Sequence, residues 1–345
     1  MKVIIDNKIP YIREAITKIA DEVVFASGKE FTSELVKDAD ALIVRTRTLC
    51  NRELLEGSRV QFIATATIGF DHIDTAYCKE AGIEWTNAPG CNSGSVAQYV
   101  QSALILLERE KGIRLNKCTI GIVGVGNVGR KVARVADELG MRTLLCDPPR
   151  QACETGVMFY SLQQLAEECD IITFHVPLCR DGEYKTYHMV DETFFRVLRH
   201  SPVLINTSRG EVVKTGALLQ ALEKGLVSDA VVDVWEGEPD IDLALLEKVF
   251  LGTPHIAGYS ADGKANATRM SLDALCRHFG ICADYRILPP VPGNPIIHAV
   301  SKAEAYLQMY NPQHDSDALK QHPESFEKLR GDYSLRREKE AYILA

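Results

Sequence analysis

The 345-residue sequence has no excess of positive charge. Its 39 lysines and arginines are outnumbered by 47 aspartates and glutamates, which gives a formal net charge of −8, and no long block of one sign occurs. Proteins that bind the phosphates of nucleic acids have an excess of lysine and arginine or a basic patch. The composition therefore argues against a nucleic-acid-binding protein. Low-complexity segments are also missing. With 46% apolar and 25% charged residues, the chain has the composition of a soluble globular protein.

Long hydrophobic runs and paired cysteines are missing too. No stretch approaches the ~20 apolar residues that a membrane helix needs. The first residues, MKVIIDNKIP, lack the basic start and long apolar centre of a secretory signal, so we expect a cytoplasmic protein. Ten cysteines stand singly without a C-x-x-C pair, and the sequence therefore predicts neither a disulfide framework nor a metal site.

Short β-type runs alternate with helix-type segments along most of the chain, which indicates βαβ units and parallel sheets. In the first part, the predicted strands are residues 2–6, 23–26, 41–44 and 61–66. A long helix is predicted over 93–110, where apolar residues recur at helical spacing. The alternation then restarts, with strands at 119–123, 143–146, 170–175, 203–206 and 228–234 and a helix at 127–139. The sequence thus predicts an α/β protein with two doubly wound parallel-sheet lobes.

The alternation of strand-type and helix-type segments ends at about residue 286. The run PPVPGNP marks a linker, and the mixed-charge run FEKLRGDYSLRREKEAY predicts a solvated amphipathic helix. A tail of about 60 residues holds little core of its own, so we expect it to pack on a partner subunit.

The most specific motif is GIVGVGNVG, residues 121–129, which forms G-x-G-x-x-G between a predicted strand and a predicted helix. Glycines at these places allow a tight turn and a close approach of backbone N–H groups to a pyrophosphate at the helix N-terminus. Asp147 follows the next strand, roughly 20 residues further on, where a carboxylate accepts the ribose hydroxyls of a dinucleotide. The same carboxylate would repel the extra phosphate of NADP, so the pattern favours NAD as the cofactor. The predicted cofactor-binding residues here are Gly124, Gly126, Asn127, Val128, Gly129 and Asp147.

Three further polar residues stand near the ends of later predicted elements. They are Arg209 in NTSRGEVV, Glu238 in DVWEGEP and His255 in GTPHIAGYS. Oxidation of an alcohol needs a base that takes the hydroxyl proton and a fixed cation that holds a neighbouring carboxylate. Histidine, glutamate and arginine suit these roles, so we predict that the three residues form a catalytic site.

The segments NTSRGEVV, DVWEGEP and TPHIAG together resemble the D-2-hydroxyacid dehydrogenases. Within that family the likeness is closest to members that oxidise 4-phospho-D-erythronate on the route to pyridoxal 5′-phosphate. The segments ALIVRTRT, FIATATIGFDHID, APGCNSGSVAQYV and LLCDPPR carry this closer likeness. The resemblance implies a Rossmann-type NAD domain over 93–257, a flavodoxin-like substrate domain over 1–92 completed by about 258–285, and a small C-terminal dimerisation region over 286–345.

The same resemblance implies roles for individual residues. It implies that Arg209 and Glu238 are active-site residues and that His255 is the proton donor or acceptor. It further implies that Thr46, Thr67 and Tyr259 contact the substrate. NAD contacts are implied for Val176 through its backbone, and for Thr207, Ser208, Arg209, Asp233 and Gly258.

The resemblance leaves alternatives open. A related enzyme acting on 3-phosphoglycerate or on another D-2-hydroxy acid would have the same fold, because the few side chains around the substrate decide specificity. A non-enzymatic NAD(H) sensor similar to transcriptional corepressors would also keep the same polar residues. The expected partners are therefore a small-molecule substrate and a second copy of the chain, with neither nucleic acid nor membrane.

Overall fold

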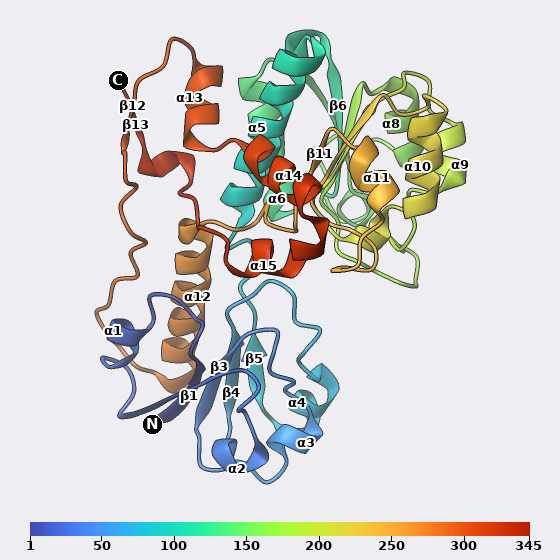
Figure 1. Cartoon of the computed structure of the whole chain (residues 1–345). Helices are drawn as coiled ribbons and strands as arrows, with labels where there is room; N and C mark the ends of the chain where they lie inside the picture. Colours follow the sequence, from blue (N-terminus) through green and yellow to red (C-terminus); the bar gives the residue numbers. More distant parts are fainter. The chain divides into compact units, whose positions relative to one another are not determined.

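A computed structural model describes residues 1–345, which form two compact units (Figure 1). Unit 1 consists of Met1–Asn92 and Ser260–Val291, and unit 2 consists of Ser93–Tyr259 and Pro292–Ala345. The tail predicted as a separate region thus belongs largely to the same compact unit as the glycine-rich motif. No helix in the structure is long and apolar enough to cross a membrane.

Unit 1 contains a five-stranded sheet in the order β2-β1-β3-β4-β5, with all neighbouring strands parallel. This is the flavodoxin-like strand order, in keeping with the flavodoxin-like domain that the resemblance implied. The edge strand β5 was not predicted, because it is only three residues long and begins with the exposed Glu84. The strands are β1 (Lys2–Asp6), β2 (Glu22–Ala26), β3 (Ala41–Val44), β4 (Phe62–Thr65) and β5 (Glu84–Thr86).

Helices cover both faces of this sheet because successive residues of its buried strands point to opposite faces. Ile5 and Ile43 belong to a core with α1 and α12, whereas Ile4 and Leu42 belong to a second core with α2, α3 and α4. Helix α12 returns from far along the sequence, and its N-cap Ser260 accepts the Gly263 N–H at 2.9 Å. The helices are α1 (Arg13–Ile16), α2 (Ser33–Val36), α3 (Arg52–Leu55), α4 (Thr75–Ala81) and α12 (Ala261–Phe279).

Unit 2 contains a six-stranded parallel sheet in the order β11-β10-β9-β8-β6-β7. The chain passes from β7 at one edge to β8 on the other side of β6, so the strand order reverses at β6. Beyond β7, the Tyr160 N–H donates to the Leu145 carbonyl at 2.8 Å, which continues the Rossmann pattern by one short segment. The strands are β6 (Thr119–Val123), β7 (Arg142–Cys146), β8 (Ile171–Phe174), β9 (Val203–Asn206), β10 (Asp229–Val232) and β11 (Leu251–Gly252).

Two hydrophobic cores fill the faces of this second sheet. One contains α5 and α6, and the other contains α8, α9, α10 and α11. Helix α5 is buried along most of its length, in keeping with its apolar residues at helical spacing. The helices are α5 (Ser93–Lys111), α6 (Asn127–Glu138), α7 (Pro148–Gln151), α8 (Leu162–Glu168), α9 (Glu192–Arg196), α10 (Thr215–Glu223) and α11 (Leu243–Lys248).

The C-terminal part of unit 2 packs on its own chain, with α13 and α14 beside α5 (Figure 1). Leu319 and Phe326 are buried in the core with α10 and α11. The Ser316 hydroxyl also accepts the Gly252 N–H at 3.0 Å, so this region contacts the end of β11 directly. Its elements are β12 (Ile296–Ile297), α13 (Lys302–Met309), α14 (Pro312–Gln321), α15 (Phe326–Gly331) and β13 (Ile343–Leu344).

The prediction of a solvated amphipathic helix at 326–342 was therefore wrong. Only α15, six residues long, is helical there, and Phe326 is almost fully buried. The following segment is irregular and buries Arg336. The alternating charges of residues 326–342 are typical of a solvated helix face. In the structure, however, buried side chains of this segment contact residues that are distant in sequence.

Candidate active site

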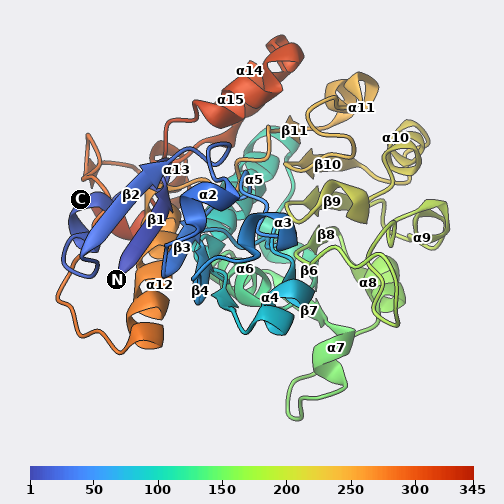
Figure 2. The same cartoon turned by 90° about the horizontal axis from the view of Figure 1, so that it is seen from below.

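The predicted cofactor and catalytic residues of unit 2 follow the carboxyl ends of its parallel strands. The glycine-rich turn follows β6 and Asp147 follows β7, while the remaining segments follow β8, β9, β10 and β11. Figure 2 shows these six strands side by side. Because parallel strands end at one edge of a sheet, this edge carries all of the segments, and in open α/β sheets ligands bind beyond it.

The three glycines of the motif each meet a different spatial demand. Gly124 has a positive φ of 85°, and a Cβ there would lie 2.6 Å from the His175 carbonyl oxygen. A Cβ on Gly129 would lie 2.0 Å from the Gly124 carbonyl oxygen, so this position permits close packing of helix on strand. A Cβ on Gly126, by contrast, would meet no protein atom within 4 Å. The space at Gly126 fits a pyrophosphate that approaches the backbone.

The start of α6 also fits a phosphate group. Gly126 is its N-cap and provides no side-chain oxygen for the first N–H groups of this 12-residue helix. These N–H groups and the helix dipole favour a bound anion. Asp147 lies beside the turn, and its Oδ2 accepts the Val125 N–H at 2.8 Å. A carboxylate with remaining lone pairs therefore stands at the end of β7, where an adenosine ribose is recognised in Rossmann domains.

Arg150 lies close to the same turn but is already engaged. Its guanidinium donates to the Val125 carbonyl at 2.7 Å and is paired with Glu154. Glu154 neutralises the positive charge of Arg150, which would otherwise be available to bind the 2′-phosphate of NADP. The arrangement therefore fits NAD better than NADP.

His255 and Glu238 form a hydrogen-bonded pair. The His255 Nδ1 lies 2.8 Å from Glu238 Oε2, and Glu238 Oε1 accepts the Trp235 N–H at 2.9 Å. Burial raises the pKa of Glu238, but its hydrogen bond to His255 and the other donors outweigh this effect, so the net pKa is lowered. An ionised carboxylate can only accept, and Nδ1 therefore carries the proton. The other ring nitrogen, Nε2, remains a proton acceptor.

Asp233 fixes the backbone that carries His255. Its carboxylate is 1% exposed and accepts the Thr253 hydroxyl at 2.7 Å, the Ile256 N–H at 2.8 Å and the Ala257 N–H at 3.0 Å. Its carbonyl accepts the His255 N–H at 2.8 Å. Burial raises the pKa of Asp233, against the lowering effect of its partners. The structure thus gives Asp233 a positioning role, while its contact with NAD stays a prediction.

Arg336, which the sequence analysis missed, holds the same segment from its carbonyl side. It donates to the carbonyls of Ile256 at 3.1 Å, Ala257 at 2.6 Å and Tyr259 at 3.0 Å. Its guanidinium lies 3.9 Å from the centre of the Tyr310 ring. No local signal identifies this arginine, because it stands in a charged run and the three carbonyls that it binds are 77 to 80 residues away in sequence.

Arg209 lies on the loop after β9. Gly210 makes this loop pack tightly, because a Cβ there would lie 2.0 Å from the backbone of Trp235, three residues before Glu238. The Asn206 side chain donates to the Arg209 carbonyl at 3.0 Å and accepts the Ser208 N–H at 3.1 Å. The Arg209 guanidinium is half-buried and donates to the Ser208 carbonyl at 2.8 Å. The loops carrying Arg209 and Glu238 are therefore adjacent.

The segment after β8 has a structural histidine. The His175 ring contacts the Thr173 hydroxyl at 2.9 Å and the Thr207 hydroxyl at 3.2 Å. Burial lowers the pKa of His175 to about 3, so the ring stays neutral. Val176 lies against Gly124, where its side chain would contact an added Cβ. The arrangement joins the loops after β8 and β9 beside the glycine-rich turn.

In unit 1, Thr46 and Thr67 follow neighbouring strands at equal distances. Val44 and Thr65 are register partners at the ends of β3 and β4, and each threonine comes two residues later. Thr46 is exposed, while the Thr67 hydroxyl donates to the Gly69 carbonyl at 2.8 Å. Both residues thus lie at the carboxyl edge of this sheet, as a ligand-binding role requires. Their contact with substrate stays a prediction.

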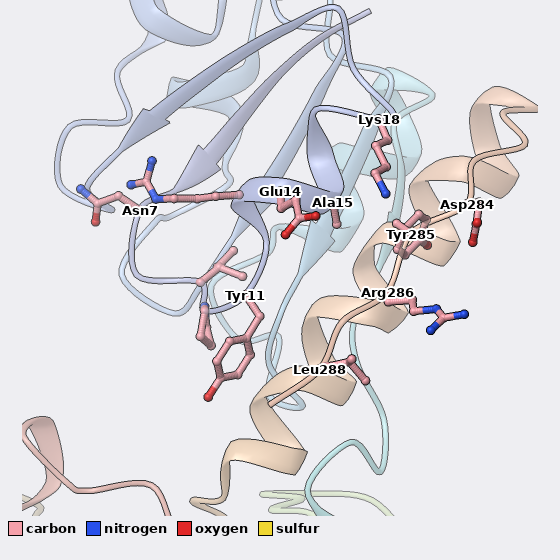
Figure 3. A pocket seen from close by; sticks show the side chains of 12 residues that line it. Asn7, Tyr11, Glu14, Ala15, Lys18, Asp284, Tyr285, Arg286 and Leu288 are labelled. Carbon is pink, nitrogen blue, oxygen red and sulfur yellow. The ribbon is translucent and has the colours of Figure 1, made fainter. Parts of the chain in front are cut away.

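A separate hollow of unit 1 lies between the α1 segment and the chain that follows α12 (Figure 3). It includes Tyr11, Lys18 and Arg286 and is open and mainly polar. Neither Thr46 nor Thr67 lines it. Its lining has charges of both signs, and none of the predicted site residues is among them.

The glycine-rich turn and the paired acid and base on one sheet edge define a nicotinamide-dependent dehydrogenase. Residues 95–257 match the family described as D-isomer specific 2-hydroxyacid dehydrogenase, NAD binding domain. A protein of Bacteroides fragilis named erythronate-4-phosphate dehydrogenase is 68% identical over 99% of this chain and 98% of its own length. The protein of that name from Escherichia coli O157:H7 is 41% identical, over 98% of this chain and 92% of its own.

Solved structures agree with this relationship. The D-lactate dehydrogenase of Aquifex aeolicus, complexed with NAD and lactic acid, has a TM-score of 0.65 and 27% identity. The match covers 81% of this chain and 96% of that chain. This chain belongs to the D-isomer specific 2-hydroxyacid dehydrogenase family, is an NAD-dependent dehydrogenase and has the α/β fold that was predicted.

The different surroundings of two glycines allow a test of the NAD site. We expect Gly126→Ala to leave the free energy of unfolding nearly unchanged but to raise the dissociation constant of NAD roughly tenfold or more, because the methyl group occupies space for the pyrophosphate. Gly129→Ala should instead lower stability, since its Cβ would clash with the Gly124 carbonyl. Calorimetric titration and denaturant unfolding measure both effects. Unchanged NAD affinity in Gly126→Ala would contradict the assignment.

Proposed function

We propose that this protein oxidises 4-phospho-D-erythronate at C2 to (R)-3-hydroxy-2-oxo-4-phosphooxybutanoate, with NAD as hydride acceptor, on the route to pyridoxal 5′-phosphate. The observation that carries the proposal is the His255 and Glu238 pair at the edge that also bears the NAD turn, in a chain 68% identical to a protein named for this substrate. The reaction needs a base beside the C2 hydroxyl and a cation beside the C1 carboxylate.

His255 acts as the base in this proposal. Its Nε2 accepts the C2 hydroxyl proton, while Nδ1 keeps its hydrogen bond to Glu238 at 2.8 Å. The carboxylate orients the ring and stabilises the imidazolium that forms. When bound, NAD takes the hydride from C2, and the chain contributes orientation and charge.

Arg209 and the residues predicted to contact substrate complete the proposed site. The guanidinium of Arg209 holds the C1 carboxylate through its planar fork and polarises the C2 oxygen. Thr46, Thr67 and Tyr259 bind the rest of the substrate through their hydroxyl groups. For NAD, we propose the glycine-rich turn for the pyrophosphate and Asp147 for the ribose. The other NAD contacts come from Val176, Thr207, Ser208, Arg209, Asp233 and Gly258.

The substrate is tested directly by turnover. Purified protein with NAD should oxidise 4-phospho-D-erythronate with a kcat/KM well above that for 3-phosphoglycerate or D-lactate. NADH and the 2-oxo acid product are followed together, with an added 2-oxo acid in parallel wells in case bound NADH slows turnover. Preference for another acid would overturn the substrate assignment. No turnover on any of them would favour a sensor of NAD(H).

The proposed base is tested by His255→Gln. We expect turnover to fall by a factor on the order of 10² or more, because the side chain can no longer take the proton. NAD binding should survive, since His255 is not among the residues proposed to hold the cofactor. His200→Gln is the matched control, because His200 is exposed. Near-native turnover in His255→Gln would exclude the role.

We also propose that the protein works as a homodimer in the cytoplasm. All ten cysteines are free, as suits a reducing compartment. Supporting the dimer, Ile296 and Ile343 pair in the short parallel sheet of β12 and β13 and are 44% and 65% exposed. Leu344 and Val300 nearby in sequence are 51% and 98% exposed. Exposed apolar side chains and unpaired strand edges are typical of a protein interface.

Light scattering after size exclusion tests the dimer. We expect a mass about twice the 38.3 kDa of one chain, and a shift toward one chain when Ile343 and Leu344 are both changed to Glu. Met158→Glu is the control, because Met158 is 71% exposed in another part of unit 2. A wild-type mass of one chain would refute the dimer. A dimer that survives the double change would place the interface elsewhere.

A further inference from the structure

Arg330 of α15 lies beside the proposed catalytic pair. Its Nη1 is 3.7 Å from Glu238 Oε2, the same oxygen that lies 2.8 Å from His255 Nδ1. Its Nε donates to the Tyr259 hydroxyl at 3.3 Å. The side chain is 29% exposed, so ligands can still reach it. A residue of the C-terminal region thereby contacts both the acid of the pair and a residue proposed to bind substrate.

The guanidinium has hydrogen-bonding capacity that the chain does not use. Arginine carries five N–H donors, and only the one on Nε has a hydrogen-bond acceptor in the chain. At 3.7 Å, the approach of Nη1 to Glu238 is an ion pair without a hydrogen bond. The two Nη groups therefore present a free fork, which is the geometry that recognises the oxygens of a phosphate or carboxylate.

The charges around Glu238 favour an anionic ligand during turnover. One carboxylate faces two basic side chains, His255 and Arg330. When His255 holds the substrate proton, both are cationic, so the positive charge around Glu238 rises; Asp233 and Glu327 are the other carboxylates whose charges act on His255 and Arg330. A phosphate monoester carries close to two negative charges near neutral pH and offers three acceptor oxygens. The site becomes most attractive to such a group when the proton has been transferred.

The spacing suits a short phosphorylated acid. The His255 Nδ1 and the Arg330 Nη1 contact the same carboxylate oxygen, so the distance between these two nitrogens cannot exceed the sum of the two contact distances, and Nε2 lies across the small imidazole ring. In a four-carbon acid with its C2 hydroxyl at His255, the phosphorus lies on the order of 5 Å from that hydroxyl. The imidazole and the guanidinium are therefore close enough to contact the C2 hydroxyl and the terminal phosphate of one such molecule.

We propose that Arg330 binds the terminal phosphate of the substrate and makes the C-terminal region a determinant of specificity. This inference rests on the proposed function. The relatives named for a phosphorylated substrate match this chain over 98% or more of its length, whereas the D-lactate dehydrogenase structure leaves about a fifth of it unmatched. In this proposal, the guanidinium on α15 gives a 2-hydroxy acid site a contact for the phosphate.

The test compares phosphorylated and unphosphorylated substrate in the same variants. We expect Arg330→Met to lower kcat/KM for 4-phospho-D-erythronate roughly 10- to 100-fold more than kcat/KM for D-erythronate, since a charge-assisted hydrogen bond is lost only for the phosphate. Arg330→Lys should recover part of the loss, because it keeps the charge without the fork. Lys328→Met is the matched control, because Lys328 is an exposed cation on the same helix.

Competitive inhibition by inorganic phosphate gives a second reading. Its inhibition constant should rise in Arg330→Met and stay unchanged in Lys328→Met. If both substrates lose activity equally, Arg330 only positions Tyr259 and Glu238, and the proposal is overturned. An unchanged phosphate inhibition constant would overturn it as well. Failure of the proposed function is seen separately, because the wild-type protein would then not turn over 4-phospho-D-erythronate.

Discussion

Two buried side chains of opposite charge, Asp233 and Arg336, bind the backbone of the short segment that follows His255. Asp233 accepts the N–H groups of Ile256 and Ala257, and Arg336 donates to the carbonyls of the same two residues. An unpaired buried charge is costly, so each group requires the segment in this one conformation. The proposed base is thereby tied to the end of β10 on one side and to the C-terminal region on the other.

The neighbouring loops at the carboxyl edge of the sheet pack closely against one another, backbone against backbone. Gly210 brings the Arg209 loop onto the backbone of Trp235, and the N–H of Trp235 holds Glu238. His255, Glu238 and Arg209 thus reach one edge of the sheet on loops that are far apart in sequence but adjacent in the structure. The C-terminal region adds to this scaffold, since α14 contacts the end of β11 and Arg330 of α15 contacts Glu238. A common NAD-binding sheet can acquire a new specificity in this way, because the strands themselves need not change.

Much of this arrangement could be predicted because its signals are local. The strands of both sheets are short apolar runs between turns, and β6 and β9 have the predicted bounds. The glycine-rich motif was readable because its glycines stand at a fixed spacing between a strand-type run and a helix-type run. Strands β5 and β11 were missed because three and two residues carry too little pattern. The amphipathic helix predicted near the C-terminus was wrong, since the apolar and charged residues there find their partners on α5, in the core with α10 and α11, and on the loop after His255.

The sequence by itself determined the fold class, the dinucleotide motif and the types of residue able to move a proton and hold a carboxylate. These follow from the alternation of apolar residues, from the spacing of the glycines, and from side-chain chemistry. Only the tertiary structure decided that His255 pairs with Glu238, that Asp233 and Arg336 hold the same segment, and that Arg330 lies beside it. These contacts join residues that are 17 to about 90 positions apart, and parallel strands and a folded-back C-terminal region bring them together.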